Sequence, residues 1–329
     1  CRSVSGTSAF FVKADWKKME SENSFTALSG IFWFFKSLIL AVVNLVTAIT
    51  NPQMWLDWSD KESLIRFVYY GASVELFFVF LLCFLIIILA GLLSQTFLWG
   101  VVRVTEGVSN SIGRLVAWAG LIMVVQQVMI VFLQRIFART DIVLSFGVPF
   151  QYGVSWFAEE LKLYNAAIIC LCISYTFVQQ GHVRVDLFYA PASFRKKKII
   201  DMLGAAFFMI PMAVLMWLYS WFFMWRHLIT PKVSASDKLE LMLRKSRVVK
   251  WNIETIGVSA NGFNAYFLFK VLMVAMVAFI FIQAISFFCR SLAELREGEK
   301  SDGKYLDLDN KPDIPAASGQ TGKNPQTTV

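Results

Sequence analysis

Continuous apolar stretches constrain the fold of this chain more than any other feature. Residues 74–93 read VELFFVFLLCFLIIILAGLL, with one charged residue at the edge. About 20 consecutive apolar residues cross the hydrocarbon core of a bilayer as an α-helix. This stretch therefore predicts a membrane-spanning helix.

Five further stretches have the same character, namely 31–49, 115–133, 161–180, 199–225 and 265–288. Their apolar runs are continuous rather than alternating, which argues against a barrel of β-strands. Composition agrees, because 57% of the 329 residues are hydrophobic and 16% are charged, whereas about a quarter are charged in a soluble domain. We expect an all-α integral membrane protein with about six transmembrane helices, and Pro211 predicts a kink in the fifth.

The placement of basic residues predicts the orientation in the membrane. Lys and Arg accumulate in three segments that this pattern assigns to the cytoplasm, namely 1–30, 100–114 and 181–198. Segment 100–114, with Arg103 and Arg114, is expected to be the link between the second and third spans. Six spans return the C-terminus to the same side, so we expect both termini in the cytoplasm. Segment 226–250 conflicts with this scheme, because it would be periplasmic and yet holds seven basic residues.

Within that basic segment, SDKLELMLRKSRVVKW is typical of a helix at the membrane surface. Ser236 or Asp237 is expected to cap its N-terminus. The side chains expected to face the apolar side are Leu239, Met242, Leu243 and Val249. The surface position leaves the orientation scheme intact.

Motifs of enzymes and of cofactor sites are missing from the sequence. The chain has two histidines, His182 and His227, whereas a haem-carrying membrane subunit usually needs axial histidines paired inside the bundle. No metalloprotease, elbow-serine or phosphate-loop motif occurs. Cys170 and Cys172 lie about 200° apart around a helix and cannot share a metal ion. We expect no enzymatic activity, cofactor or metal site.

Polar side chains within the apolar stretches indicate contacts between helices. Gln127 and Gln134 are seven residues apart and share one helix face, with Gln126 beside them. This arrangement favours contact with another helix over contact with lipid. Lys270 lies near the end of its stretch, where a long side chain can reach the membrane surface. No continuous path of acidic residues is present, so the sequence favours an accessory or scaffold subunit over a pump.

The stretch GHVRVDLFY, residues 181–189, interrupts the apolar pattern. His182, Arg184 and Asp186 alternate along it and share one side if the segment is extended. We interpret it as the cytoplasmic end of the fourth span, where Arg184 and Asp186 pair with each other, with lipid phosphate or with a partner subunit. A catalytic or metal-binding cluster is the disfavoured interpretation.

Several motifs follow one another in a family-specific order. They are SWFAEELKLYNA (with Glu159, Glu160 and Lys162), GHVRVDLFY, a basic patch, MIPMAVL, WNIETIGVSANGFNAYFLFKVLM (with Glu254 and Lys270) and FIQAISFF. In this order the chain resembles the small permease subunit, of DctQ type, of the tripartite ATP-independent periplasmic (TRAP) transporters. The resemblance covers about residues 106–292 and is to a longer form with an N-terminal extension.

The resemblance implies a four-helix small-permease module at 106–298, preceded by an extension with two spans at 1–105. Composition predicts a disordered polar tail at 299–329. In such transporters the small subunit is a static scaffold for a large permease subunit in the bacterial inner membrane, which takes up an organic acid with a cation. The expected partners are that permease, a periplasmic binding protein and membrane lipids, and no nucleic acid. The alternative is a free-standing membrane interaction or assembly protein without a transport role.

Overall fold

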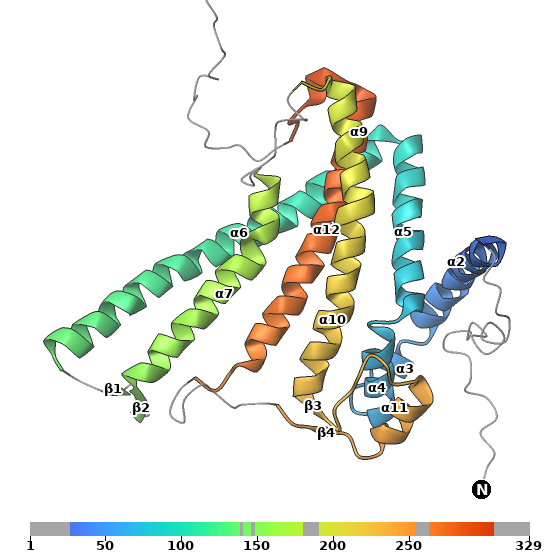
Figure 1. Cartoon of the computed structure of the whole chain (residues 1–329). Helices are drawn as coiled ribbons and strands as arrows, with labels where there is room; N and C mark the ends of the chain where they lie inside the picture. The colour runs from blue at the N-terminus through green and yellow to red at the C-terminus, as the bar shows by residue number, and fades with distance from the viewer. Residues whose placement is uncertain (1–26, 139–140, 146–148, 180–190, 254–262, 306–329) are drawn as a thin grey trace, which may run out of the picture.

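The computed structural model describes residues 27–138, 141–145, 149–179, 191–253 and 263–305 (Figure 1). Within these ranges, six helices are long and apolar enough to cross a membrane, as the sequence predicts. They are built from α2 (Ala27–Thr50), α5 (Val74–Leu93), α6 (Gln95–Val131), α7 (Val154–Val178), α9 (Phe194–Gly204) continued by α10 (Ile210–Leu228), and α12 (Phe267–Glu297). The protein is an all-α, multi-pass membrane protein.

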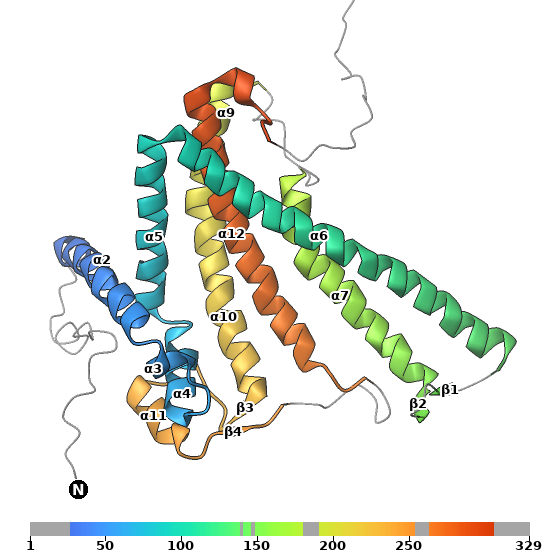
Figure 2. The same cartoon turned by 180° about the vertical axis from the view of Figure 1, so that it is seen from behind.

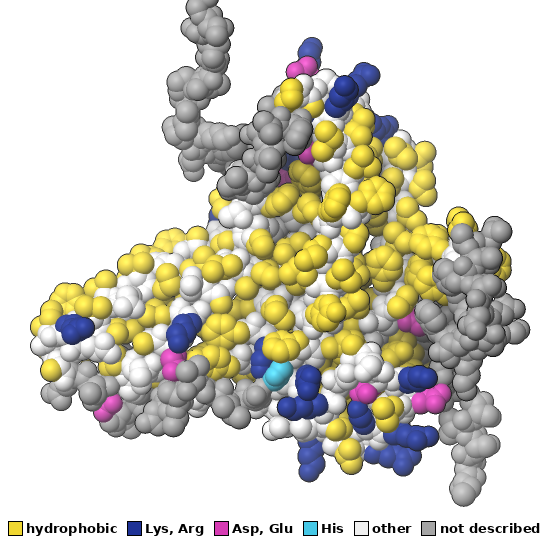
Figure 3. All heavy atoms as spheres, in the orientation of Figure 1, with side chains coloured by type: hydrophobic (Ala, Val, Ile, Leu, Met, Phe, Trp, Pro, Cys, Tyr) yellow, Lys and Arg dark blue, Asp and Glu magenta, His cyan; other side chains and the backbone are white. Residues whose placement is uncertain are grey.

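The surface has the polarity of a membrane protein. Charged side chains gather at the two ends of the helices in Figure 3, and apolar side chains cover the surface between them. Large apolar residues there are exposed, such as Phe207 at 70% and Phe208 at 77%. Such a surface is stable only where lipid, or another apolar molecule, covers it.

Helix α6 is longer than the sequence predicts. Segment 100–114, expected to be a link between two spans, is helical throughout, and the π-helical turn η1 (Phe132–Ile136) extends the helix to 42 residues in all. The link prediction is wrong because apolar residues at helical spacing continue through this segment. Leu98, Trp99 and Val102 are buried against α12, and this burial stabilises the helical conformation of the segment. The boundary between an extension and a module at 105/106 consequently falls inside a helix.

The helices form two groups. Helices α6 and α7 lie side by side and diverge from the rest, while α9, α10 and α12 form the centre, with α5 and α2 on its other side (Figures 1 and 2). The far ends of α6 and α7 are joined through the antiparallel strands β1 (Asp141–Ser145) and β2 (Pro149–Gly153). Gly113 lets the two helices touch, because a Cβ atom there would lie 2.4 Å from Cβ of Tyr175.

A small folded unit, here named the cap, covers one end of α10. It consists of α3 (Gln53–Leu56), α4 (Lys61–Tyr70), α11 (Leu239–Ser246) and the paired strands β3 (Ile229–Thr230) and β4 (Lys250–Trp251). Asp60 begins α4 by accepting hydrogen bonds from two main-chain N–H groups. The indole N–H groups of Trp217 and Trp221 on α10 donate to main-chain carbonyls at Gly71 and Val68, at 2.8 and 2.9 Å.

Helix α11 confirms the apolar side predicted for it. Met242 and Val249 are buried in the core of the cap, and Leu239 and Leu243 are half-buried. The capping prediction is wrong, since Lys238 stands at the N-cap and neither Ser236 nor Asp237 does. The Asp237 carboxylate is instead engaged by Lys245 Nζ at 2.6 Å and by a main-chain N–H.

The cap brings segments 51–72 and 226–250 to one end of the molecule, and the bases of α9 lie at the other end with the last described residues (Figure 1). Segments 51–72 and 226–250 therefore lie on the same side of the membrane, and α9 and the last described residues lie on the other side, as the orientation scheme requires. Which end faces the cytoplasm stays a prediction. In the fifth span, a π-helical turn, η2 (Ala205–Met209), immediately precedes the segment that contains Pro211. Such a turn adjusts the helix where proline cannot donate a hydrogen bond.

Candidate functional site

The most polar part of the interior is the place where α6, α7 and α12 cross, here named the junction. On α12 its side chains are Gln283, Ser286, Arg290 and Glu294, at the three- and four-residue spacing that puts them on one face. On α6 they are Thr105, Glu106 and Ser109. Helical periodicity in each element therefore presents one polar stripe to the other.

The charged half of the junction is a chain of ion pairs around Arg290. Its Nε donates to Glu106 Oε1 at 2.7 Å, and its Nη2 donates to the other carboxylate oxygen, so the pair is bidentate. Its Nη1 donates to the Lys304 carbonyl at 2.9 Å and to Glu294 Oε1 at 3.4 Å. Lys198 Nζ contacts Glu294 Oε2 at 2.6 Å.

These ion pairs matter for stability because most of the charged groups are buried. Glu106, Arg290 and Glu294 are only 5%, 7% and 2% exposed, and each buried charge has a partner of opposite sign. Lys198 also contacts the exposed carboxylate of Asp302 at 2.8 Å, so the ion pairs continue to the surface. A charge moved out of water must be paired to be tolerated, and bidentate arginine–carboxylate pairs are the strongest kind. The charged half fixes α6, α9 and α12 relative to one another.

The neutral half of the junction adds α7 to this arrangement. The Thr105 hydroxyl donates to Ser286 Oγ at 2.8 Å, and the Ser174 hydroxyl donates to Gln283 Oε1 at 3.0 Å. The hydroxyls of Ser109 and Ser174 lie 2.7 Å apart. Side-chain hydrogen bonds of this kind join helices in a membrane, where no water competes for them.

The segment after α12 folds back over the charged half, and residues 298–305 are here named the strap. Gly298 has φ +94°, a conformation open to glycine, and it turns the chain out of α12. The Gly303 N–H then donates to Glu294 Oε1 at 3.3 Å, and the Tyr305 ring packs on Trp99 at 5.4 Å. Residues 299–305, assigned to the polar tail in the sequence analysis, are thus folded because they supply partners to buried charges. Residues 306–329 lie outside the described ranges.

The motif SWFAEELKLYNA lies at the other end of α7. Glu159 accepts the Phe263 N–H at 2.9 Å and the Tyr266 hydroxyl at 3.4 Å, which joins α7 to the segment before α12. Glu160 accepts Gln126 Nε2 at 3.1 Å and the Tyr164 hydroxyl at 3.0 Å. Lys162 is exposed.

Gln126 thus forms hydrogen bonds between α6 and α7, while Gln127 and Gln134 face outward. Gln127 on α6 and Gln134 on η1 are exposed, and neither makes a hydrogen bond within the described part of the chain. Lys270 is half-buried, with its ammonium 5.6 Å from the centre of the Phe223 ring. The remaining candidates lie outside the described residues and are His182, Arg184, Asp186 and Glu254.

Sequence reasoning missed the charged half of the junction. Glu106 fell in the segment taken for a link, and Arg290 lay two residues beyond the end of the sixth apolar stretch. A signal was available, since Gln283, Ser286, Arg290 and Glu294 recur at helical spacing. That stripe predicts a polar contact for α12 without revealing its partner.

The geometry of the junction suits a fixed clamp better than a reaction centre. Both oxygens of Glu106 are taken by Arg290, and both oxygens of Glu294 have basic partners. Among the described residues, no three His, Cys, Asp or Glu side chains gather as metal ligands do. Comparison of the chain with protein-family models, curated proteins and solved structures gives no match in any of the three. Fold and junction together define a multi-pass helical membrane protein with internally locked helices.

Proposed function

We propose that the chain is the small scaffold subunit of a TRAP-type secondary transporter in the bacterial inner membrane. In this role it supports a large permease subunit in cation-coupled uptake of an organic acid delivered by a periplasmic binding protein. The ordered motifs between residues 106 and 292 support the assignment to this type. The junction supports a static role, because its buried ion pairs hold three spans in one arrangement.

One observation carries the scaffold proposal, and it is the outer stripe of α6, formed by Val124, Gln127, Val131 and Gln134. All four side chains are exposed and share one helix face. Gln127 lies inside an apolar stretch, where an amide that faces lipid has no hydrogen-bond partner. A helix of another membrane protein can supply that partner. The stripe is therefore the surface that we assign to the large subunit.

Replacement of both glutamines tests this assignment. Gln127→Leu/Gln134→Leu keeps side-chain size and removes the amides. If the stripe binds another subunit through these amides, the tagged chain should retain at least tenfold less large permease after extraction in mild detergent, as about 1–2 kcal/mol is lost at each helix–helix bond. The control is Val125→Leu/Met129→Leu, which alters exposed residues on another face of the same helix and should retain the permease.

The opposite result has a clear meaning. If the stripe faces lipid, the leucine variant should be more stable than wild type and should retain its partners unchanged. A tagged wild-type chain that brings down no large permease, from a genome whose neighbouring genes encode none, would favour the free-standing assembly protein instead.

A further inference from the structure

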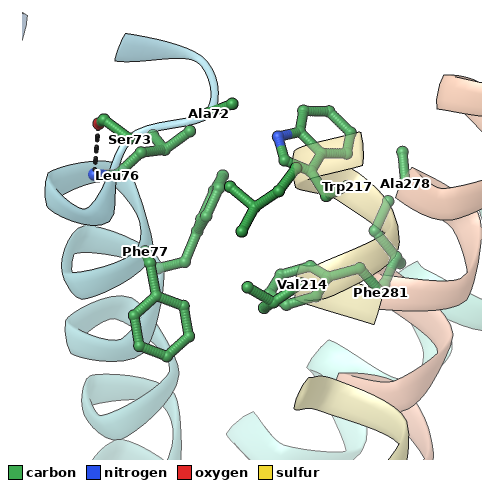
Figure 4. Close-up of a pocket in the computed structure, with 11 residues that line it drawn as sticks. Ala72, Ser73, Leu76, Phe77, Val214, Trp217, Ala278 and Phe281 are labelled. Carbon is green, nitrogen blue, oxygen red and sulfur yellow. Dashed lines mark hydrogen bonds between the residues drawn. The ribbon is translucent and has the colours of Figure 1, made fainter. Parts of the chain in front are cut away.

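An apolar pocket of about 220 Å³ lies between α5, α10 and α12, against the cap. Figure 4 shows side chains from all three helices turned toward it. Those that shape it most are Leu76 and Phe77 from α5, Val214 and Trp217 from α10, and Ala278 and Phe281 from α12. The α10 and α12 residues come from the middle of their helices, so the pocket reaches into the depth of the bilayer.

The walls of the pocket offer no polar group to a ligand. The Ser73 hydroxyl, at its edge, donates to the Tyr70 carbonyl at 3.0 Å and accepts the Leu76 N–H at 3.2 Å (Figure 4). The Trp217 indole N–H is taken by the Gly71 carbonyl at 2.8 Å. Water needs several polar partners to occupy a cavity. An occupant of this pocket is therefore apolar.

The size of the pocket decides which apolar occupant fits. A cavity of about 150 Å³ lined by aliphatic and aromatic side chains takes one benzene ring. At about 220 Å³ this pocket holds a little more than that, and a helix about 10 Å across is too wide for it. A slim hydrocarbon chain matches both its volume and its lining.

The head-group level next to the pocket carries unpaired positive charge. Ala72 and Trp217 line the pocket and also pack against the core of the cap, so the cap adjoins the pocket. The exposed basic side chains of the cap and the adjoining end of α10 make no ion pair within the described ranges, and they are Lys61, Arg226, Lys232, Lys238, Arg244, Arg247 and Lys250. A lipid phosphate group at this level would be attracted by these basic side chains.

We propose that the pocket binds one acyl chain of a phospholipid whose phosphate lies at the cap. The chain fills a gap in the contact between α5 and the central helices. The aromatic contacts that join α5 to α12 in the described chain are Phe80 with Phe281 at 5.5 Å and Phe84 with Phe288 at 5.1 Å. The pocket adjoins the first of these pairs, so the acyl chain continues the packing toward the cap.

Lipid binding by purified protein tests the proposal. The protein is extracted in digitonin, which has no linear alkyl chain, stripped of lipid and then given palmitoyl-oleoyl phosphatidylglycerol. Wild type should retain one phospholipid per chain in native mass spectrometry. Its melting temperature should rise by about 5 °C at a lipid concentration 100 times Kd. Inorganic phosphate alone should give no rise.

Filling the pocket supplies the decisive variant. Ala278→Phe should retain no lipid, and its melting temperature should not respond to phosphatidylglycerol. The control is Ala117→Phe, a residue exposed on α6, which should behave as wild type does. If Ala278→Phe does not yield a monodisperse protein, Ala72→Leu on the opposite wall serves the same purpose.

Three results would overturn the proposal. One is a wild type that neither retains lipid nor gains stability from it. Another is a filled variant that still binds lipid as wild type does. The third is a wild-type dimer that Ala278→Phe converts to a monomer, since the occupant would then be part of a second copy of the chain.

Discussion

Removal of either partner of the Arg290–Glu106 pair should strongly destabilise the protein, and removal of both should cost less than the sum. Both side chains are more than 90% buried, and both carboxylate oxygens of Glu106 depend on Arg290. A buried pair broken on one side typically costs about 3–5 kcal/mol, because a charge is left uncompensated. The two single substitutions should destabilise the protein by different amounts, since the side chain that remains has different partners in each case.

Arg290→Met should be the more harmful single change. It leaves Glu106 without either of its ion contacts, whereas Glu106→Leu leaves Arg290 with Glu294 and the Lys304 carbonyl. The double variant removes both charges and fills the space with apolar atoms, so we expect a coupling energy of about 2 kcal/mol between the sites.

Reversible unfolding in mixed micelles, followed by tryptophan fluorescence, measures these free energies. The matched control is Arg103→Met, because Arg103 is an exposed base on α6 whose guanidinium lies 5.0 Å from the Tyr305 ring. Its loss should cost less than about 1 kcal/mol. Strictly additive single changes, or an Arg290→Met variant as stable as the Arg103→Met control, would refute the argument that the junction locks the helices.

Two further predictions concern backbone approach and helix capping. In thermal unfolding, Gly113→Ala should destabilise the protein by about 1–3 kcal/mol, because its Cβ would lie 2.4 Å from Cβ of Tyr175 and the helices must separate. The control is Gly107→Ala, whose Cβ meets open space on the same helix. This variant should be as stable as wild type or up to about 1 kcal/mol more stable. Asp60→Ala should cost about 1 kcal/mol at pH 7. Burial raises the pKa of Asp60, but hydrogen bonds from two main-chain N–H groups and the Ser63 hydroxyl, together with the charge of Arg66, outweigh it and hold the pKa below its ordinary value of 3.8. The contribution of Asp60 to the free energy of unfolding is thus complete above pH 3.8 and is lost as pH falls through the lower folded pKa. Denaturation at pH 7 and at pH 2 should therefore show a smaller difference in stability between wild type and variant at the lower pH. A difference that grows toward acid would contradict this.

The spans were predictable because each is encoded within one stretch of sequence. Continuous apolar runs identify a membrane helix without knowledge of its neighbours. The junction was not predictable in the same way, because Glu106 and Arg290 are 184 positions apart and nothing local marks them as partners. Gln126 shows the same limit, since the rotation of α6 against α7 decides which of two adjacent glutamines contacts α7.

The prediction of the 100–114 link failed for a related reason. Charged residues within an apolar chain usually mark the end of a span, and Arg103 and Arg114 therefore indicated a link between two spans. The segment is instead a continuous helix, in which Arg103 and Arg114 are exposed and Glu106 has a buried basic partner. Charge that is paired in three dimensions looks the same in a sequence as charge that is hydrated.

The length of α6 also sets the outline of the molecule in the bilayer. Together with η1 it has 42 residues, which measure about 63 Å at 1.5 Å per residue. Even a steep tilt of about 40° would leave about 48 Å along the membrane normal against a core of about 30 Å. The part of the helix that exceeds the hydrocarbon core must lie in a head-group layer, or be covered by a neighbouring protein or a locally thicker bilayer. Since α6 and α7 splay away from the other helices (Figures 1 and 2), the chain occupies more area in one leaflet than in the other. A flat bilayer can accept such a taper only when lipids or a neighbouring protein fill the opposite leaflet unequally, so this protein favours neighbours of the complementary wedge shape.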